Sequence, residues 1–320
     1  MWLSSRRLLF GFLISGCVVL LTVYNGVLFS YAGAASISFS LTQGISTDAL
    51  IVSGTVNCVT GEVVKGLRKH IASLGAIHMI VPASMVVDCL SLEGVKCHDE
   101  NDILSYNSSW LEGANSNGWT ANPARRKWYY QQFVKLLAFQ RISLSSRFVM
   151  WDADNVLVRS YDPFPGTQSR FLTCGAGFPT KGQYVEATQA LTNVSNARED
   201  VVVHQIPIEQ EILRELIAHI CPDQVNEGCA RHILDSIPST AHPNLGISEY
   251  HLYYAWISTR HPNLVLLDHK KRLERTGKQD WDSSTCEAVM RRWYMLRRWY
   301  RWNVYMITLE TKLEKKKKRP

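Results

Sequence analysis

The sequence predicts an α/β protein with a mostly parallel central sheet flanked by helices. Residues 49–54 and 77–82 are short apolar runs that end in turn residues, and 63–74 between them has apolar residues at helical spacing. A strand, a helix and a second strand within this length are typical of a βαβ unit and a parallel sheet. The apolar run that begins at Phe148 predicts a third strand. Hydrophobic residues make up 46% of the 320-residue chain and charged residues 20%, which is enough for a substantial core.

The other elements follow from local patterns. Glu209 and Glu211 lie where a helix begun near Pro207 would have its first turn, and Ser248 suits a helix N-cap. The remaining predicted elements are a polar loop with short pieces of structure over 88–122, a helix over 125–139, a turn over 161–166, a helix over 205–221, a helix from 248 and a strand over 263–268.

The N-terminal residues differ from the rest of the chain. Arg6 and Arg7 precede 8–29, a run of mostly apolar residues without charge that is long enough to span a bilayer as a helix. The two arginines place residues 1–7 in the cytosol. Residues 30–47, rich in Ser, Ala, Gly and Thr, form a stem. We therefore expect a single-pass type II protein of the Golgi or endoplasmic reticulum membrane, with the body of the chain lumenal.

A cleaved signal peptide is the alternative. Ala32-Gly33-Ala34 fits the small-residue pattern of a cleavage site, although the apolar run is longer than a usual signal core. Either topology places the body of the chain outside the cytosol.

Glycosylation patterns and cysteines agree with that location. Asn107-Ser108-Ser109 and Asn193-Val194-Ser195 match the acceptor pattern for N-linked glycans. Of the eight cysteines, Cys89 with Cys97 and Cys221 with Cys229 could form short-loop disulfides in an oxidising lumen, although the sequence alone leaves the connectivity open.

The positive charge is concentrated at the C-terminus. The net charge is +7, and 287–320 carries eleven Lys and Arg against three Glu. Residues 286–320 therefore predict a basic amphipathic helix and a Lys-rich tail, which could lie on a membrane surface or pack on the domain. A basic body is absent, so we expect no nucleic-acid partner.

Two carboxylates follow the third predicted strand. Asp152 and Asp154 are one residue apart and need a positive charge near them. Mn²⁺ or Mg²⁺ with a bound phosphate would supply it. The same residues also fit a haloacid-dehalogenase-type phosphotransferase, in which Asp152 is the nucleophile and Asp154 the acid/base. A polar turn without a metal is the third alternative.

Three stretches in this order resemble a little-characterised family of nucleotide-diphospho-sugar transferase-like proteins of the GT-A type. They are 128–136 (WYYQQFVKL), 148–158 (FVMWDADNVLV) and 248–253 (SEYHLY), and the resemblance covers roughly 48–270. The chain departs from the family near His204, where similar proteins tend to carry a second His or an aromatic residue. The resemblance implies a single GT-A-like catalytic domain over 48–285.

The resemblance also implies an activity and its partners. It implies transfer of a sugar from a nucleotide-sugar donor to a hydroxyl of a glycan, protein or lipid acceptor in the secretory pathway, with Mn²⁺ or Mg²⁺ as cofactor. A degenerate fold that serves as a catalytically silent lumenal binding protein is an alternative. The donor sugar and the oligomeric state are not predicted.

Site residues follow from the same resemblance. Asp154 would bind the metal, while Asp152 would hold the ribose hydroxyls or share the metal. His269, directly after the late strand, is the predicted third ligand, and His204 is the second choice.

Two residues of the 125–139 helix complete the predicted donor site. Gln132 and Lys135 share one helix face. Lys135 would pair with a phosphate or with Asp152, and a solvated surface lysine is the alternative. Glu249 is the predicted general base for an acceptor hydroxyl, with first-turn helix stabilisation as the alternative.

Overall fold

The structure is a computed structural model. It describes strands within 8–30 and residues 46–112, 122–173, 182–194, 199, 201–222, 227–238, 246–269, 273–275, 290–291, 293–294 and 305–309. The chain divides into two compact units, Met1–Gly44 and Ile45–Pro320.

The first unit does not contain the predicted helix over 8–29. Its described residues form an antiparallel sheet of β1 (Leu8–Ile14), β2 (Cys17–Tyr24) and β3 (Val27–Ser30). β2 and β3 contain Val18, Val19, Val23 and Val27, and such β-branched residues favour strands over a helix. Among the described residues, no helix has the length and apolar character needed to cross a membrane.

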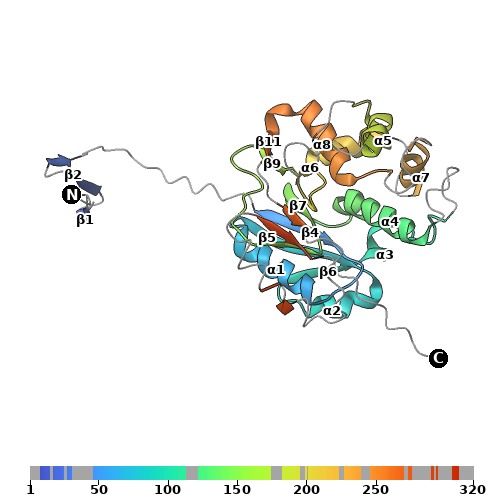
Figure 1. Cartoon of the computed structure of the whole chain (residues 1–320), viewed down its shortest axis with the longest axis horizontal. Coiled ribbons are helices and arrows are strands. Elements are labelled where there is room, and N and C mark those ends of the chain that lie inside the picture. Colours follow the sequence, from blue (N-terminus) through green and yellow to red (C-terminus); the bar gives the residue numbers. More distant parts are fainter. Residues whose placement is uncertain are drawn as a thin grey trace. The chain divides into compact units, whose positions relative to one another are not determined.

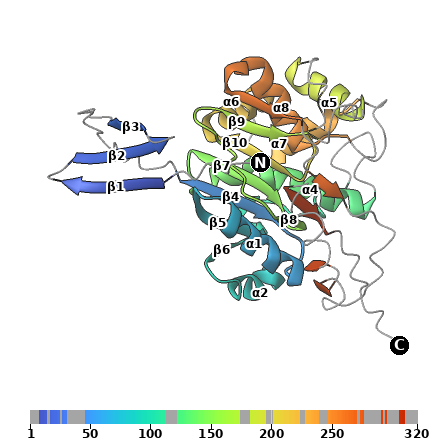
Figure 2. The same cartoon turned by 60° about the vertical axis from the view of Figure 1, so that its left-hand side comes forward.

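The second unit is built on a mostly parallel sheet, as the sequence predicts, and this sheet has five strands. The strands are β4 (Thr47–Val52), β5 (Leu74–Val81), β6 (Val95–Asp99), β7 (Arg147–Asp152) and β10 (Gln205–Glu209). Figure 2 shows them side by side in the order β10-β7-β4-β5-β6. Neighbouring strands are parallel except β10, which runs antiparallel to β7.

Helices cover both faces of this sheet (Figure 1). One face carries α1 (Cys58–His70) and α2 (Val86–Leu90). The other carries α3 (Glu100–Ile103), α4 (Pro123–Leu137), α5 (Gly182–Thr192), α6 (Gln210–Ile220), α7 (Glu227–Asp235) and α8 (Glu249–Arg260). Ala49 and Ile51 of β4 pack toward α1, whereas Leu50 and Val52 pack toward α4. Because both faces are covered, the central strands β4 and β7 are apolar without alternation over 49–52 and 148–151.

Two smaller sheets complete the described strands. β9 (Ser169–Leu172) pairs in parallel with β11 (Val265–Asp268), which confirms the late strand. β13 (Met306–Thr308) pairs with β12 (Leu273–Arg275) and, antiparallel, with β8 (Asn155–Leu157). Short 3₁₀ turns lie at Ala83–Met85, Ala138–Gln140 and Pro262–Leu264.

Two predictions of secondary structure were wrong. The predicted helix over 205–221 is a strand up to Glu209, because Ile206 and Ile208 pack on the α4 face and β10 is an edge strand, where a proline is tolerated. The helix predicted within 286–320 is interrupted by strand β13. The short pieces of structure expected in the loop over 88–122 include β6 and α3.

Part of the C-terminal segment packs within the second unit. Trp293 is helical and buried, and its Nε1 donates to Glu62 Oε2 of α1 at 3.1 Å. Most of 286–320, including the Lys-rich tail, lies outside the described residues.

Two of the cysteine pairs that the sequence suggested are bonded. Cys89–Cys97 joins α2 to β6, and Cys221–Cys229 joins the end of α6 to α7. Cys58 is also disulfide-bonded.

Two histidines on neighbouring parallel strands contact each other, and His78 of this pair is buried. His78 Nδ1 of β5 lies 3.0 Å from His98 Nε2 of β6, so one ring donates to the other. On its far side, His78 Nε2 lies 3.8 Å from Asp48 Oδ2. Burial lowers the pKa of His78 to about 4, although the nearby Asp48 carboxylate opposes the change.

We expect this pair to make stability pH-dependent. His78 stays neutral in the folded protein down to about pH 4, whereas the unfolded chain binds a proton below about pH 6.5. The free energy of unfolding should therefore fall by at most about 3 kcal/mol as the pH drops through this interval. His78→Gln should flatten that dependence in urea titrations, and His232→Gln on the exposed face of α7 should not. Parallel profiles for wild type and His78→Gln would contradict the assignment.

Candidate functional site

The candidate site lies at the carboxyl end of β7. Asp152 is the last residue of that strand, opposite Val52 of β4 and His204 before β10. From β4 the chain continues to β5 and β6 on one side, while β7 joins β4 on the other side. In open α/β sheets, ligands bind at such a switch point, outside the carboxyl ends of the strands.

The strand determines where the Asp152 side chain lies. Phe148 and Met150 pack on the α4 face, and Asp152 continues this alternation toward the same helices. The chain then turns, so the extended geometry of β7 ends at Asp152 and Asp154 lies in the turn. The Leu309 N–H donates to the Asp154 carbonyl at 2.7 Å, which ties this turn to the residue following β13.

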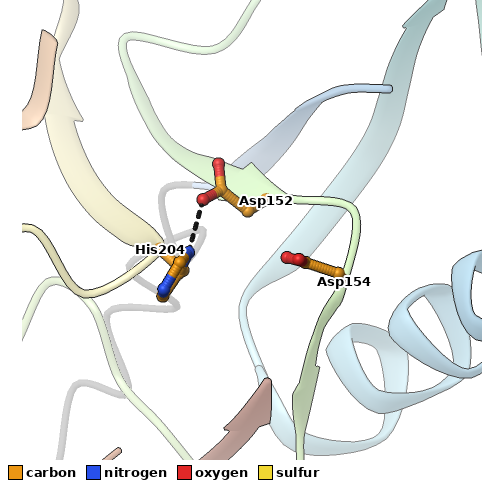
Figure 3. Close-up of side chains that lie close together, drawn as sticks. All are labelled: Asp152, Asp154 and His204. Atoms are coloured by element: carbon orange, nitrogen blue, oxygen red, sulfur yellow. Dashed lines mark hydrogen bonds and ion pairs between the residues drawn. The ribbon is translucent and has the colours of Figure 1, made fainter. Parts of the chain in front are cut away.

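Three side chains at this end of β7 could hold a metal ion together. Asp152, Asp154 and His204 each offer a ligand atom, and these atoms lie within 4.8 Å of one another. Figure 3 shows the two aspartates and the imidazole arranged around one point. Carboxylate oxygens suit Mg²⁺ and Mn²⁺, and an added imidazole favours Mn²⁺ of the two. The described residues contain no second group of this kind.

His204 reaches the group through an unusual backbone conformation. Its φ is 63°, which is uncommon for a residue other than glycine. The conformation lets the His204 carbonyl accept from Asp152 N at 2.9 Å, while its Nδ1 lies 2.8 Å from Asp152 Oδ2. Backbone conformations of this sort cost roughly 1–3 kcal/mol and cluster at functional sites.

Lys135 of α4 is a buried cation beneath the group. It is 5% exposed, and its Nζ lies 2.6 Å from Asp152 Oδ1, 2.6 Å from Glu249 Oε1 and 3.0 Å from the Tyr250 hydroxyl. Of its two predicted partners, phosphate or Asp152, the structure shows Asp152. One ammonium therefore lies between two carboxylates from different elements.

Lys135 and its two carboxylate partners shift one another's pKa. Burial alone would raise the pKa of Asp152, but Lys135 and His204 outweigh burial and hold it below its usual range. Burial would lower the pKa of Lys135, and Asp152 and Glu249 outweigh it, so this pKa is raised. For Glu249, burial prevails over Lys135 and the pKa is raised. The Lys135 ammonium therefore favours the ionised form of Asp152, which is the more exposed of its two carboxylate partners.

Glu249 and Gln132 lie too deep for the roles predicted for them. Glu249 is 2% exposed and paired with Lys135, so an acceptor hydroxyl does not reach its carboxylate. Gln132 is also buried, and its Oε1 accepts from Glu249 N at 3.0 Å at the start of α8. Ser248 is the N-cap of this helix, as predicted, and accepts from His251 N. These residues position Lys135 and α8.

His269 is not part of the group of possible metal ligands. It follows β11, which pairs with β9 in a separate sheet. Its ring is 51% exposed and its nearest carboxylate is Glu199, with Nδ1 and Oε2 3.8 Å apart. The second choice, His204, occupies the position that the sequence prediction gave to His269.

Sequence reasoning missed Tyr250 and Asn155. Tyr250 donates to Asp152 Oδ1 at 2.5 Å. Asn155 is buried after the two aspartates, and its side chain contacts Met306 and Thr308 of β13. Tyr250 lies within the quoted 248–253 stretch, whereas only the fold reveals the partners of Asn155.

Comparison with known proteins adds only remote similarity. No family model matches the chain, and no curated protein matches it. Similar solved structures include two glycosyltransferases. Mouse xyloside xylosyltransferase 1 in its apo form has 9% identity and a TM-score of 0.43, over 82% of this chain and 97% of that one. The WbbM bifunctional glycosyltransferase has 11% identity and a TM-score of 0.41, over 91% of this chain and half of that one (50%). Similarity at this level does not establish an activity.

Proposed function

We propose that the chain is a metal-dependent glycosyltransferase of GT-A type, which moves a sugar from a nucleotide-sugar to a hydroxyl acceptor. One observation supports this above the others. Two aspartates and a histidine converge at the switch point between β4 and β7, where the strand order reverses and where open α/β sheets bind ligands.

Each residue of the group has a role in this proposal. Asp154 and His204 hold the divalent ion, and Asp152 orients the His204 ring through its Oδ2. When bound, Mn²⁺ or Mg²⁺ would stabilise the negative charge of the leaving diphosphate. Lys135 holds Asp152 ionised and in place.

The neighbouring strand end leaves room for the nucleotide. Gly54 is exposed just beyond β4, and a Cβ built there would lie 3.8 Å from Gln131 Nε2 of α4. Without a side chain at Gly54, a ligand can approach the backbone, and the Gln131 amide offers hydrogen bonds to it. We assign this edge to the nucleoside part of the donor.

The haloacid-dehalogenase alternative requires Asp152 to attack a phosphate. Its Oδ1 accepts from Lys135 and Tyr250, and its Oδ2 faces His204 Nδ1. A carboxylate held by these donors is a poor nucleophile. The geometry therefore favours the transferase over the phosphotransferase.

A lumenal location in the Golgi or endoplasmic reticulum is part of the proposal. Cys89–Cys97 and Cys221–Cys229 support it, because such bonds persist in oxidising compartments.

Nucleotide-sugar turnover with Mn²⁺ tests the function. The wild type, offered a panel of nucleotide-sugars, should hydrolyse or transfer at least one of them, and chelation should abolish turnover. Asp154→Ala should lower turnover by at least about a hundredfold, because it removes a metal ligand. Asp235→Ala, at the exposed end of α7, is the matched control. Metal-independent turnover, or phosphate release from a phosphomonoester instead, would reject the proposal.

A further inference from the structure

Tyr250 lies beneath Asp152 and is used by none of the steps proposed above. It is in the first turn of α8 and 3% exposed. Its hydroxyl is 2.5 Å from Asp152 Oδ1 and 3.0 Å from Lys135 Nζ. The two side chains that are hydrogen-bonded to this hydroxyl, Asp152 and Lys135, come from β7 and α4.

The direction of each hydrogen bond follows from the chemistry of the groups. An ammonium only donates and an ionised carboxylate only accepts. The Tyr250 oxygen must therefore accept from Lys135, and its O–H must donate to Asp152. Lys135 has three N–H bonds, and Asp152, Glu249 and Tyr250 provide an acceptor for each.

Lys135 alone does not fix the Asp152 carboxylate. An ammonium is a compact point charge, which attracts a carboxylate without selecting one orientation of its plane. The Tyr250 O–H adds a second donor to the same oxygen, Oδ1, from a different element. With Oδ1 held by two donors, Oδ2 faces His204 Nδ1 at 2.8 Å.

We propose that Tyr250 is a positioning residue that sets the orientation of the Asp152 carboxylate and, through it, of the His204 ring. The effect on metal binding rests on the function proposed above, whereas the effect on the carboxylate itself does not.

The same helix provides a matched control. Tyr253 lies three residues further along α8 and is 0% exposed. Its hydroxyl accepts from Glu209 N of β10 at 2.8 Å and is not bonded to Asp152. Tyr250→Phe and Tyr253→Phe therefore remove the same atom at the same depth, and only the first removes a donor to the site.

Mn²⁺ titration of the purified full chain, followed by the paramagnetic resonance of free Mn²⁺, is the first measurement. Tyr250→Phe should weaken Mn²⁺ binding by about tenfold, the lower end of the range for changes to residues that orient metal ligands. Tyr253→Phe should leave it unchanged, with a comparable fall in melting temperature. Equal weakening in both variants would show a merely structural role and reject the proposal, as would unchanged binding in Tyr250→Phe.

Crystal structures of both variants without metal are the second measurement. The Asp152 carboxylate should be rotated or disordered in Tyr250→Phe and unchanged in Tyr253→Phe. An unmoved carboxylate in Tyr250→Phe would reject the proposal even if the wild type bound no Mn²⁺. Metal binding without sugar turnover would reject the proposed function and leave the comparison of the two tyrosines valid.

Discussion

Replacing Lys135 by Met should lower the free energy of unfolding by about 3–5 kcal/mol, the range for breaking a buried ion pair. Met keeps an unbranched side chain as far as Cε and removes the charged Nζ. Asp152 and Glu249 would then lie near each other without the ammonium between them, and burying an unpaired charge is costly. Urea unfolding monitored by circular dichroism measures the loss.

A second substitution separates the loss of stability due to unpaired charge from the loss due to packing. Adding Glu249→Gln to Lys135→Met removes one uncompensated charge, so the double variant should recover part of the loss, with a coupling energy of about 1–3 kcal/mol. Arg214→Met, in an exposed pair with Glu211, is the control and should cost less than about 1 kcal/mol. Additive losses from Lys135 and Glu249 would contradict the charge argument.

The central strands and the two aspartates were predictable because their evidence is local. The apolar runs of β4 and β5 flank a helical pattern, and the run of β7 leads directly into Asp152. Such patterns need no knowledge of distant neighbours. The pairing of Lys135 with Asp152 was one of three alternatives that the sequence left open, beside a phosphate and a solvated surface position.

The rest of the site depends on contacts far apart in the sequence. Lys135 is 114 residues from Glu249 and 115 from Tyr250, so no local pattern joins them. His204 enters through a left-handed backbone conformation, which its residue type does not predict. The helix predicted from Gln205 failed for a similar reason, because pairing with β7 outweighed the local pattern.

Helix α1 packs against β8, the strand that follows the turn with Asp154. β8 begins directly after Asp154 and packs against Gly66 of that helix. A Cβ built on Gly66 would lie 2.7 Å from the carbonyl oxygen of Leu157 and 3.1 Å from its nitrogen. Contacts below 3.0 Å force a shift, and backbone cannot rotate away as a side chain can. The absence of a side chain at Gly66 therefore permits this approach of helix to strand.

Gly66→Ala should consequently lower the free energy of unfolding by about 3 kcal/mol, the upper end of the range for overpacking. Gly61→Ala in the same helix is the matched control, because its Cβ would meet only Leu92 Cδ2 at 3.9 Å. This variant should gain up to about 1 kcal/mol from the higher helix propensity of alanine. Urea unfolding of the two variants should thus give changes of opposite sign, and stabilisation by both would contradict the close approach. Because β8 continues from the Asp154 turn, Gly66→Ala should also weaken Mn²⁺ binding, which Gly61→Ala should not.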